Sequence, residues 1–258
     1  MLPHAGRRAV GYSSGMPWFE NEAFWQTFYP YMFNERKMAA APGEVERVLA
    51  LAGVASGCVL DLCCGPARHA LVLAQKGFKV TGVDRSPFLL SKARERSADT
   101  EIEFVESDMR EFVRPGAFDL ALSLFTSFGY FDSRDEDLAV LRNVRASLKK
   151  GGVFVIDVLS KEYLIPQGAT RWDLWPSGEI HVSHYHPLPG WGRIRVEWLL
   201  VEGERARHFT FEHNLYSGQE LATLLERAGF TDVRLFGSLD GTLYDASATR
   251  LVARAVAD

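Results

Sequence analysis

The chain has 258 residues, of which 47% are hydrophobic, and a formal net charge of −4 at pH 7. This length suits one large domain, or a core domain with a modest elaboration, and supplies ample material for a buried core. A mildly acidic chain with both signs of charge interspersed argues against a nucleic-acid partner. The three cysteines do not make a disulfide framework and suit a reducing compartment, so we expect a cytoplasmic protein.

The N-terminal stretch contains a twin arginine, Arg7-Arg8, with no apolar segment behind it. We therefore expect a solvated tail rather than an export signal. No run of about 18 apolar residues occurs, so the sequence predicts no membrane-spanning helix.

Residues 19–33 are crowded with aromatic side chains. Trp25, Tyr29 and Phe33 recur every four positions, and Pro30 must start or kink a helix there. These rings either pack the segment onto the core or line a ligand pocket as part of a lid.

From about residue 58 onward, short apolar runs alternate with helical patterns. Ser86-Pro87 is a helix start, with an N-cap residue followed by proline, whereas Gly77 and Gly151-Gly152 are helix-end signals. Near-continuous Val, Ile and Leu strands that alternate with helices predict a parallel sheet covered on both faces. The predicted strands are 58–62, 78–84, 102–106, 118–125 and 153–160, and the helices between them are 67–76, 87–96 and 135–148.

The alternation breaks at residues 161–216, where three segments have the pattern of antiparallel strands. In the middle segment apolar residues alternate with charged ones, which predicts one buried and one polar face. Glu202-Gly203 supplies the turn to the third segment. The expected strands are 179–186, 193–201 and 205–213; a helix over 218–228 and strands over 232–236 and 250–256 then resume the α/β pattern.

The stretch DLCCGPARHA, residues 61–70, joins the first strand to the first helix through a glycine turn. Free N–H groups at a helix start, and a glycine that permits close approach, suit an anion or a cofactor. Asp84 ends the next strand 19 residues after Gly65, where a carboxylate can accept both hydroxyls of a ribose. Nicotinamide binding needs G-x-G-x-x-G, but this turn has a single glycine, so a cofactor without phosphates is favoured over NAD(P).

These residues resemble the class I S-adenosylmethionine-dependent methyltransferases. VLDLCCGPA (59–67) is similar to the family's first motif, an acidic residue followed by G-x-G-x-G. Asp61 matches the acidic position and Gly65 the central glycine, while Cys63 and Ala67 replace the outer glycines. LKKGGVFVIDV is similar to the segment that contains the family's fifth strand, and residues 161–216 are similar to the antiparallel cap of small-molecule members, including amino-sugar and amine N-methyltransferases.

The resemblance implies S-adenosylmethionine as cofactor and a small-molecule acceptor that is methylated at nitrogen or oxygen by in-line displacement. It implies that the glycine turn faces the methionine part, that Asp84 holds the ribose hydroxyls, and that Asp108 with Met109 flanks the adenine. Phe125 and Thr126 would lie beside the cofactor near the acceptor, although Phe125 could equally belong to the core. The implied cofactor-binding residues are Asp61, Cys63, Gly65, Ala67, Asp84, Arg85, Asp108, Met109, Phe125 and Thr126.

The expected fold class is therefore α/β, with a Rossmann-like, seven-stranded, mostly parallel sheet, helices on both faces, and a small antiparallel β cap inserted after the fifth strand. We divide the chain into an aromatic-rich N-terminal lid segment (1–45), a cofactor-binding core (46–160), the cap (161–216) and the C-terminal part of the core (217–258). Two alternatives are a cofactor-binding regulatory protein without transfer activity and a nicotinamide-dependent oxidoreductase.

Other chemistries are less well supported. Adjacent Cys63-Cys64 cannot form C-x-x-C, so no metal site is expected. There is no G-x-S-x-G elbow for a hydrolase, and neither a Pro-Cys nucleophile nor an Asn-Pro-Pro-Tyr-like motif that would indicate methylation of DNA bases. Arg68 and His69 are expected to be helix-face residues rather than catalytic ones.

Histidines in the expected cap offer candidate bases. His184 and His186 share one face of their strand, and His181 shares the other face with Tyr185. A polar sheet surface is the first interpretation; a surface that touches substrate, with a histidine as base, is the second. The candidate catalytic residues are His181, His184, His186 and Tyr130.

Overall fold

The computed structural model describes residues 10–11, 17–166, 170–175 and 178–258, so the twin arginine Arg7-Arg8 lies outside the described residues. The helices are η1 (Trp18–Glu20, a 3-10 turn), α1 (Glu22–Met32), α2 (Glu35–Ala52), α3 (Arg68–Gln75), α4 (Pro87–Arg96), α5 (Arg134–Ser147), α6 (Lys161–Leu164) and α7 (Gly218–Arg227). The strands are β1 (Val10–Gly11), β2 (Cys58–Leu62), β3 (Lys79–Asp84), β4 (Ile102–Glu106), β5 (Phe118–Ser123), β6 (Leu148–Val158), β7 (Thr170–Leu174), β8 (Ile180–Pro187), β9 (Arg193–Glu202), β10 (Arg205–Asn214), β11 (Phe230–Phe236) and β12 (Leu251–Ala257). No helix of the described chain is both long and apolar enough to cross a membrane.

The core is a seven-stranded sheet in the order β11-β12-β6-β5-β2-β3-β4. Neighbouring strands from β6 to β4 pair in parallel, and β12 runs antiparallel to both β6 and β11. The predicted α/β fold class is thus confirmed. From β2 the chain winds outward through β3 and β4 to one edge, then returns to β5 and winds the other way. The carboxyl ends of β2 and β5 therefore flank a topological switch point, where α/β sheets bind ligands.

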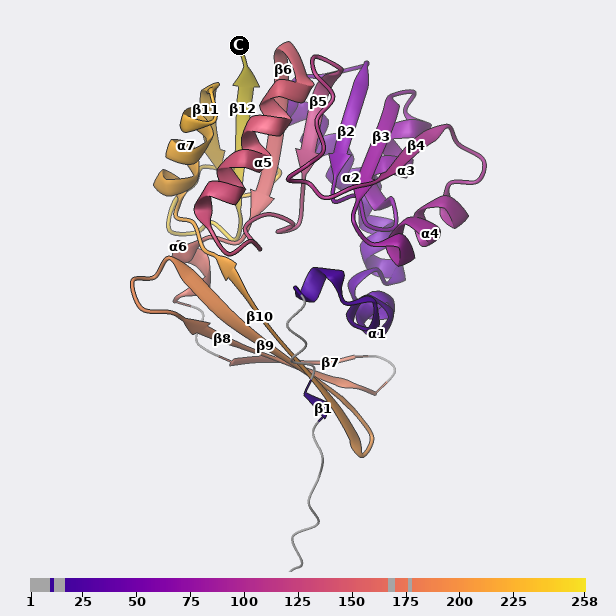
Figure 1. Cartoon of the computed structure of the whole chain (residues 1–258), viewed down its shortest axis with the longest axis vertical. Helices are drawn as coiled ribbons and strands as arrows, with labels where there is room; N and C mark the ends of the chain where they lie inside the picture. Colours follow the sequence, from indigo (N-terminus) through magenta and orange to yellow (C-terminus); the bar gives the residue numbers. More distant parts are fainter. Residues whose placement is uncertain (1–9, 12–16, 167–169, 176–177) are drawn as a thin grey trace, which may run out of the picture.

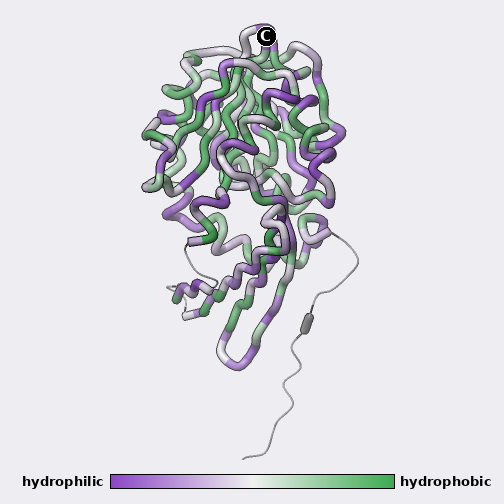
Figure 2. The backbone as a smooth tube through the Cα atoms, turned by 90° about the vertical axis from the view of Figure 1, so that its left-hand side faces the viewer, coloured by the Kyte–Doolittle hydropathy of each residue, from purple (hydrophilic) through white to green (hydrophobic). Residues whose placement is uncertain are grey.

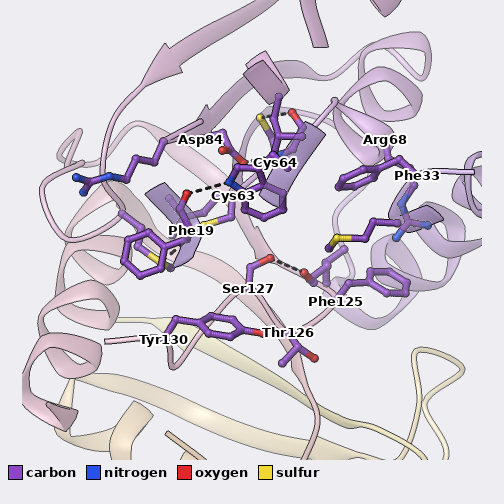
Figure 3. A pocket seen from close by; sticks show the side chains of 18 of the residues that line it. Phe19, Phe33, Cys63, Cys64, Arg68, Asp84, Phe125, Thr126, Ser127 and Tyr130 are labelled. Carbon is purple, nitrogen blue, oxygen red and sulfur yellow. Dashed lines mark hydrogen bonds between the residues drawn. The ribbon is translucent and has the colours of Figure 1, made fainter. Parts of the chain in front are cut away.

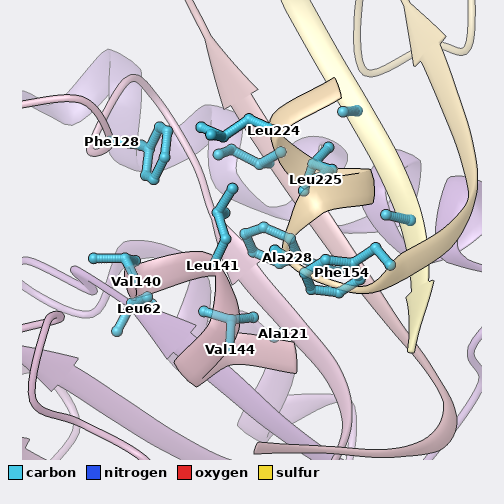
Figure 4. Packing of buried hydrophobic residues seen from close by; sticks show 14 of the residues in the cluster. Leu62, Ala121, Phe128, Val140, Leu141, Val144, Phe154, Leu224, Leu225 and Ala228 are labelled. Carbon is cyan, nitrogen blue, oxygen red and sulfur yellow. The ribbon is translucent and has the colours of Figure 1, made fainter. Parts of the chain in front are cut away.

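Helices cover both faces of this sheet (Figure 1). On one face α5 and α7 pack their apolar sides onto the strands, with Leu141 and Leu225 fully buried (Figure 4). On the other face α2, α3 and α4 do the same through Val48, Leu73 and other residues. Burial on both faces explains why the strands are near-continuous runs of apolar residues.

The segment after α5 departs from the sequence prediction. Gly151-Gly152 was expected to end the helix, but α5 ends at Ser147 and both glycines lie inside β6. Gly151 has a φ of +77°, and the pairing of β5 with β6 shifts register between Phe118 and Leu120. Gly151 therefore lies at an irregularity in the pairing of the sheet, where a residue with positive φ is common.

The cap is a second sheet in the order β1-β10-β9-β8-β7, which lies across the carboxyl ends of the core strands (Figure 1). The three predicted strands are β8, β9 and β10, and Gly203 makes the expected turn with a φ of +58°. The hairpin of β9 and β10 extends away from the core (Figure 2). Sequence inspection missed β7, an edge strand whose Trp172 and Leu174 are largely exposed, so it lacks the alternation that reveals a half-buried strand.

Helix α1 lies between the core and the cap (Figure 1). Its buried stripe is Phe24 and Phe28, which pack against Leu200 and Phe209 of the cap. The repeat noted in the sequence, which contains Trp25, lies one position further along the helix and is only half-buried. Aromatic residues on both stripes made the buried one ambiguous in the sequence.

Two smaller features of the N-terminal segment also emerge. Pro30 lies in the last turn of α1, and α2 begins at Glu35, so the proline neither starts nor divides the helix. Residue 45, the boundary expected between lid and core, falls inside α2.

Candidate active site

A cavity of about 690 Å³ lies at the carboxyl ends of β2, β3, β4 and β5, beneath the cap. Three parts of the chain line it: the N-terminal segment from η1 to α2, the loops that follow the core strands, and the inward faces of β8, β9 and β10. Figure 3 shows Asp84 and Cys63 on one side of this cavity, Phe125 on another, and Tyr130 from the loop after β5.

The glycine turn forms the floor of the cavity. Cys63, Gly65 and Ala67 all have φ near +60°, a conformation that costs a residue with a Cβ about 1–2 kcal/mol. Cys64 N–H donates to the Val83 carbonyl at 3.0 Å, which ties the turn to β3. A Cβ added at Gly65 would meet only the Phe33 ring, at 3.4 Å, so the backbone of the turn is open on the cavity side.

Asp84 sits beside this turn and is buried. Its Oδ2 accepts from Gly65 N–H at 2.8 Å and its Oδ1 from Ser86 N–H at 2.9 Å. Burial raises the pKa of Asp84 to about 6. A carboxylate has about four lone-pair sites, so these two bonds and a third from the Arg85 backbone leave capacity for a further hydroxyl, as the ribose role requires.

Asp61 and Asp108 occupy different positions. Asp61 does not line the cavity; it is buried beneath the turn, its pKa is raised by burial, and its Oδ2 has no hydrogen-bond partner among the described residues. Asp108 does line the cavity and accepts from Arg110 while it pairs with Arg85. Burial alone would raise the pKa of Asp108, but Arg110 and Arg85 hold it below its ordinary value.

Other predicted residues surround these carboxylates. Met109 lines the cavity, and its Sδ lies 3.7 Å from Cys63 Sγ. Arg85 lines it too and also pairs with Glu20 at 2.7 Å, which links β3 to the N-terminal segment. Ala67 is fully buried and does not line the cavity.

Of the two adjacent cysteines, Cys64 is buried and Cys63 is half-buried where it lines the cavity. Burial, then the charges of Asp84 and Asp61, raise the pKa of Cys63 and of Cys64 well above the ordinary value. A thiolate is the form that binds metal or attacks disulfides, so this setting disfavours both reactions. The described residues contain no group of three or more metal-ligating side chains.

Phe125 and Thr126 line the cavity at the end of β5, and both adopt positive φ, near +60°. Asp157 holds this strained pair: its side chain accepts from Phe125 N–H at 3.0 Å and its carbonyl from Thr126 N–H at 2.9 Å. Arg250 pairs with the same carboxylate at 2.6 Å and donates to Thr126 Oγ1 at 3.0 Å. Since 44% of Phe125 is exposed, its ring belongs to the cavity and not to the core.

Arg68 and His69 were expected on a helix but not in the site. Both are 7% exposed, line the cavity and bind the Glu44 carboxylate, His69 through Nε2 at 2.9 Å. The Arg68 guanidinium lies 4.1 Å from the centre of the Phe125 ring. Glu44 and Arg250 are distant in sequence from every recognised motif, so only the fold could bring them here.

The cap histidines lie elsewhere, since His181, His184 and His186 are not among the residues that line the cavity. His181 packs between Trp175 and Trp198 with ring centres 5.2 and 5.1 Å away. His184 and His186 stack on one another, 4.0 Å apart, on the opposite face of β8. Tyr130 does line the cavity.

His213, which sequence inspection passed over, is the histidine of the cap that lines the cavity. It is buried near the end of β10, and its ring centre lies 5.1 Å from that of Tyr130. Burial lowers the pKa of His213 to about 4. Its position could have been inferred from alternation, because it shares a strand face with the buried Phe209 and Phe211.

Comparison with known proteins agrees with this geometry. A family model described as "Methyltransferase domain" matches residues 59–152. The cypemycin N-terminal methyltransferase of a Streptomyces species is 32% identical over 197 residues, which cover 75% of this chain and 80% of that relative. The dTDP-3-amino-3,4,6-trideoxy-alpha-D-glucopyranose N,N-dimethyltransferase of Streptomyces venezuelae is 24% identical over 223 residues, covering 82% of this chain and 91% of the relative.

Solved structures share the fold. The CcbJ methyltransferase from Streptomyces caelestis superimposes with a TM-score of 0.73 at 23% identity, covering 83% of this chain and 94% of that one. The match covers the greater part of both chains.

Proposed function

Because the chain belongs to the class I S-adenosylmethionine-dependent methyltransferases, we propose that it transfers a methyl group from this cofactor to a nitrogen or oxygen of a small molecule held in the cavity beneath the cap. The observation that best supports this proposal is the cavity of about 690 Å³. It extends from the Gly65 turn and Asp84 to an aromatic region of the cap. One of the two relatives described above is named as an N,N-dimethyltransferase, which supports nitrogen as the acceptor atom.

Two features of the chain fit the cofactor. The backbone at Gly65 is open on the cavity side, and Asp84 keeps capacity for a ribose hydroxyl. In the proposed arrangement Asp84 holds the ribose, and Met109 with Asp108 flanks the adenine. Phe125 and Thr126 would then border the reacting end.

When bound, the cofactor supplies an activated methyl group on a positively charged sulfur. The protein residues then have to align the acceptor and exclude water, and positioning of this kind can lower a barrier by about 7–11 kcal/mol. We assign the exclusion of water to the N-terminal segment and the cap, whose Trp18, Trp198 and Phe211 line the cavity. The three cysteines are free, which supports the proposal of a reducing, cytoplasmic location.

The decisive test is transfer of labelled methyl groups from S-adenosylmethionine to a panel of amines, amino sugars and phenols. We expect a labelled product with at least one amine. Tight binding of S-adenosylhomocysteine without transfer to any acceptor would favour the regulatory-protein alternative. Binding of NAD(P) in place of S-adenosylhomocysteine, measured by calorimetry, would favour an oxidoreductase.

A further inference from the structure

The cap end of the cavity differs in chemistry from the end that contains Asp84. We call it the aromatic chamber and define it as Trp18, Tyr130, Tyr185, Trp198, Phe211 and His213, all of which line the cavity. The Trp18 ring lies 4.9 Å from both Tyr130 and Phe211, and Trp198 lies 5.4 Å from Phe211. The chamber therefore has aromatic walls, and its polar groups are two phenols, one imidazole and the indole N–H groups of Trp18 and Trp198, which have no hydrogen-bond partner among the described residues.

The imidazole of His213 has a defined tautomer. Its Nδ1 lies 3.0 Å from the Asn214 carbonyl oxygen, which can only accept a hydrogen bond, so Nδ1 carries the proton. Nε2 then has a lone pair, and no described residue donates to it. Because the pKa of His213 is about 4, this lone pair stays unprotonated at neutral pH.

Asn214, the residue that follows His213, is itself held in place by several hydrogen bonds. Its side chain donates to Asp137 at 2.7 Å and to the Phe131 carbonyl at 3.2 Å, and its backbone N–H donates to the Gly129 carbonyl. Tyr216 donates to the same Asp137 carboxylate at 2.6 Å. His213 and Tyr130 are thereby held on two segments that are pinned to one another.

No residue of the aromatic chamber is a carboxylate. The carboxylates that line the cavity elsewhere are already bound: Glu44 to Arg68 and His69, Asp84 to the glycine turn, and Asp108 to Arg85 and Arg110. Burial raises the pKa of Tyr130, so its phenol keeps its proton. The chamber thus lacks the base near neutral pH that a hydroxyl acceptor needs, whereas a neutral amine can react without one.

We propose that His213 Nε2 accepts a hydrogen bond from the N–H of a neutral primary or secondary amine in the aromatic chamber, and so orients the nitrogen for methylation. This inference rests on the proposed function and narrows it to one acceptor class. The nitrogen lone pair forms the bond to the methyl carbon, the carbon–sulfur bond breaks, and its electron pair stays on sulfur. The nitrogen becomes positively charged, is stabilised by the aromatic faces, and loses its extra proton to water on release.

This arrangement limits how many methyl groups are added. A primary or secondary amine has an N–H for His213, but a tertiary amine has none and would press a methyl group against the lone pair. Methylation should therefore end at the tertiary amine, and quaternary ammonium products should not form.

The test uses the full chain with labelled S-adenosylmethionine and a matched series of benzylamine, N-methylbenzylamine, N,N-dimethylbenzylamine and benzyl alcohol, together with an amino-sugar series of the same pattern. Three variants are compared. His213→Phe keeps the ring but removes the acceptor, His213→Gln restores an acceptor oxygen, and His186→Phe changes an exposed cap histidine outside the cavity.

We expect His213→Phe to lower kcat/KM for primary and secondary amines by about tenfold or more, as for the loss of one positioned hydrogen bond. His213→Gln should recover at least part of this activity, and His186→Phe should match the wild type. Binding of S-adenosylhomocysteine, measured by calorimetry, should be unchanged in all three, which shows that each variant is folded.

Unchanged amine kinetics in a cofactor-binding His213→Phe variant would overturn the inference, as would a quaternary product or transfer to hydroxyls in preference to amines. Each of those results leaves the proposed methyl transfer intact. Failure of the wild type to methylate any acceptor contradicts the proposed function itself.

Discussion

Backbone strain concentrates around the cavity. Of the six non-glycine residues with positive φ in the described chain, Cys63, Phe125 and Thr126 line it. Such residues persist only where their surroundings hold them, here the bond from Cys64 to β3 and the Asp157–Arg250 pair. The motif around Asp61 could be recognised in the sequence because its residues are close together in the chain. Arg250 and His213 reach the cavity through contacts between distant parts of the chain, which no short motif reveals.

Asp84 is the residue whose removal tests the cofactor site most directly. Asp84→Ala should weaken binding of S-adenosylhomocysteine by about tenfold or more, since hydrogen bonds to a charged acceptor contribute about 1.5–3 kcal/mol. Calorimetry measures the affinity, and Asp99→Ala, an exposed aspartate that does not line the cavity, is the matched control. Equal affinity in a folded Asp84→Ala protein would remove Asp84 from the cofactor site.

Asp84 also predicts a pH dependence of cofactor binding. Its pKa of about 6 means that the free protein protonates this carboxyl as the pH falls through 6, and the neutral acid is a weaker acceptor for hydroxyls. Affinity for S-adenosylhomocysteine should therefore decline below about pH 6 and be constant above about pH 7. Calorimetry across this range checks the prediction, and Asp84→Asn should lose the dependence; a wild type that binds equally at both ends contradicts it.

At the scale of elements, α1 has two aromatic faces with different tasks. Phe24 and Phe28 pack against the cap strands, while Trp25 and, just beyond the helix, Phe33 face the cavity. One side of this segment therefore packs against other elements and another side lines the cavity. These are the two interpretations that the sequence left open. Periodicity alone could not assign the sides because aromatic rings occur on more than one face of the helix.

Phe28→Ala should separate these tasks. Removal of a fully buried ring from the contact between α1 and the cap should lower the free energy of unfolding by about 3–5 kcal/mol. Gln26→Ala, an exposed position on the same helix, should change it by less than about 0.5 kcal/mol. Chemical denaturation measures both values, and equal stability of the two variants would show that α1 does not depend on this contact.

At the scale of the whole molecule, core and cap meet at a buried polar junction. Asn214 at the end of β10 binds Asp137 of α5 and the loop after β5 through side chain and backbone. Gly129 makes this possible: it has a φ of +99°, and an added Cβ would lie 2.9 Å from the Asn214 carbonyl oxygen. The core loop and the cap strand that line the cavity are therefore held in a fixed relative position by a contact between residues 85 positions apart in the chain.

Gly129→Ala should disturb this junction. The variant combines an unfavourable φ with a steric conflict against backbone, so we expect a loss of stability clearly above the roughly 1–2 kcal/mol of the φ penalty alone. Gly116→Ala, at a φ of +60° with nothing within 4 Å of the added Cβ, should show only that penalty. Thermal and chemical unfolding of the pair compares them, and a Gly129→Ala protein as stable as Gly116→Ala would rule out a tight junction.

The sequence by itself determined the α/β alternation, the three main cap strands, the glycine turn and the place of Asp84, because each depends on local periodicity or on residues near one another in the chain. Only the tertiary structure decided which histidine faces the cavity, which face of α1 is buried, and that Glu44, Arg68, Phe125 and Arg250 form one wall. These assignments depend on how distant elements pack, since a side chain's neighbours are set by sheet order and the placement of the cap. The adjacent cysteines show the division clearly: their spacing is local information, whereas the desolvation and the nearby carboxylates that raise the pKa of both thiols come from the fold.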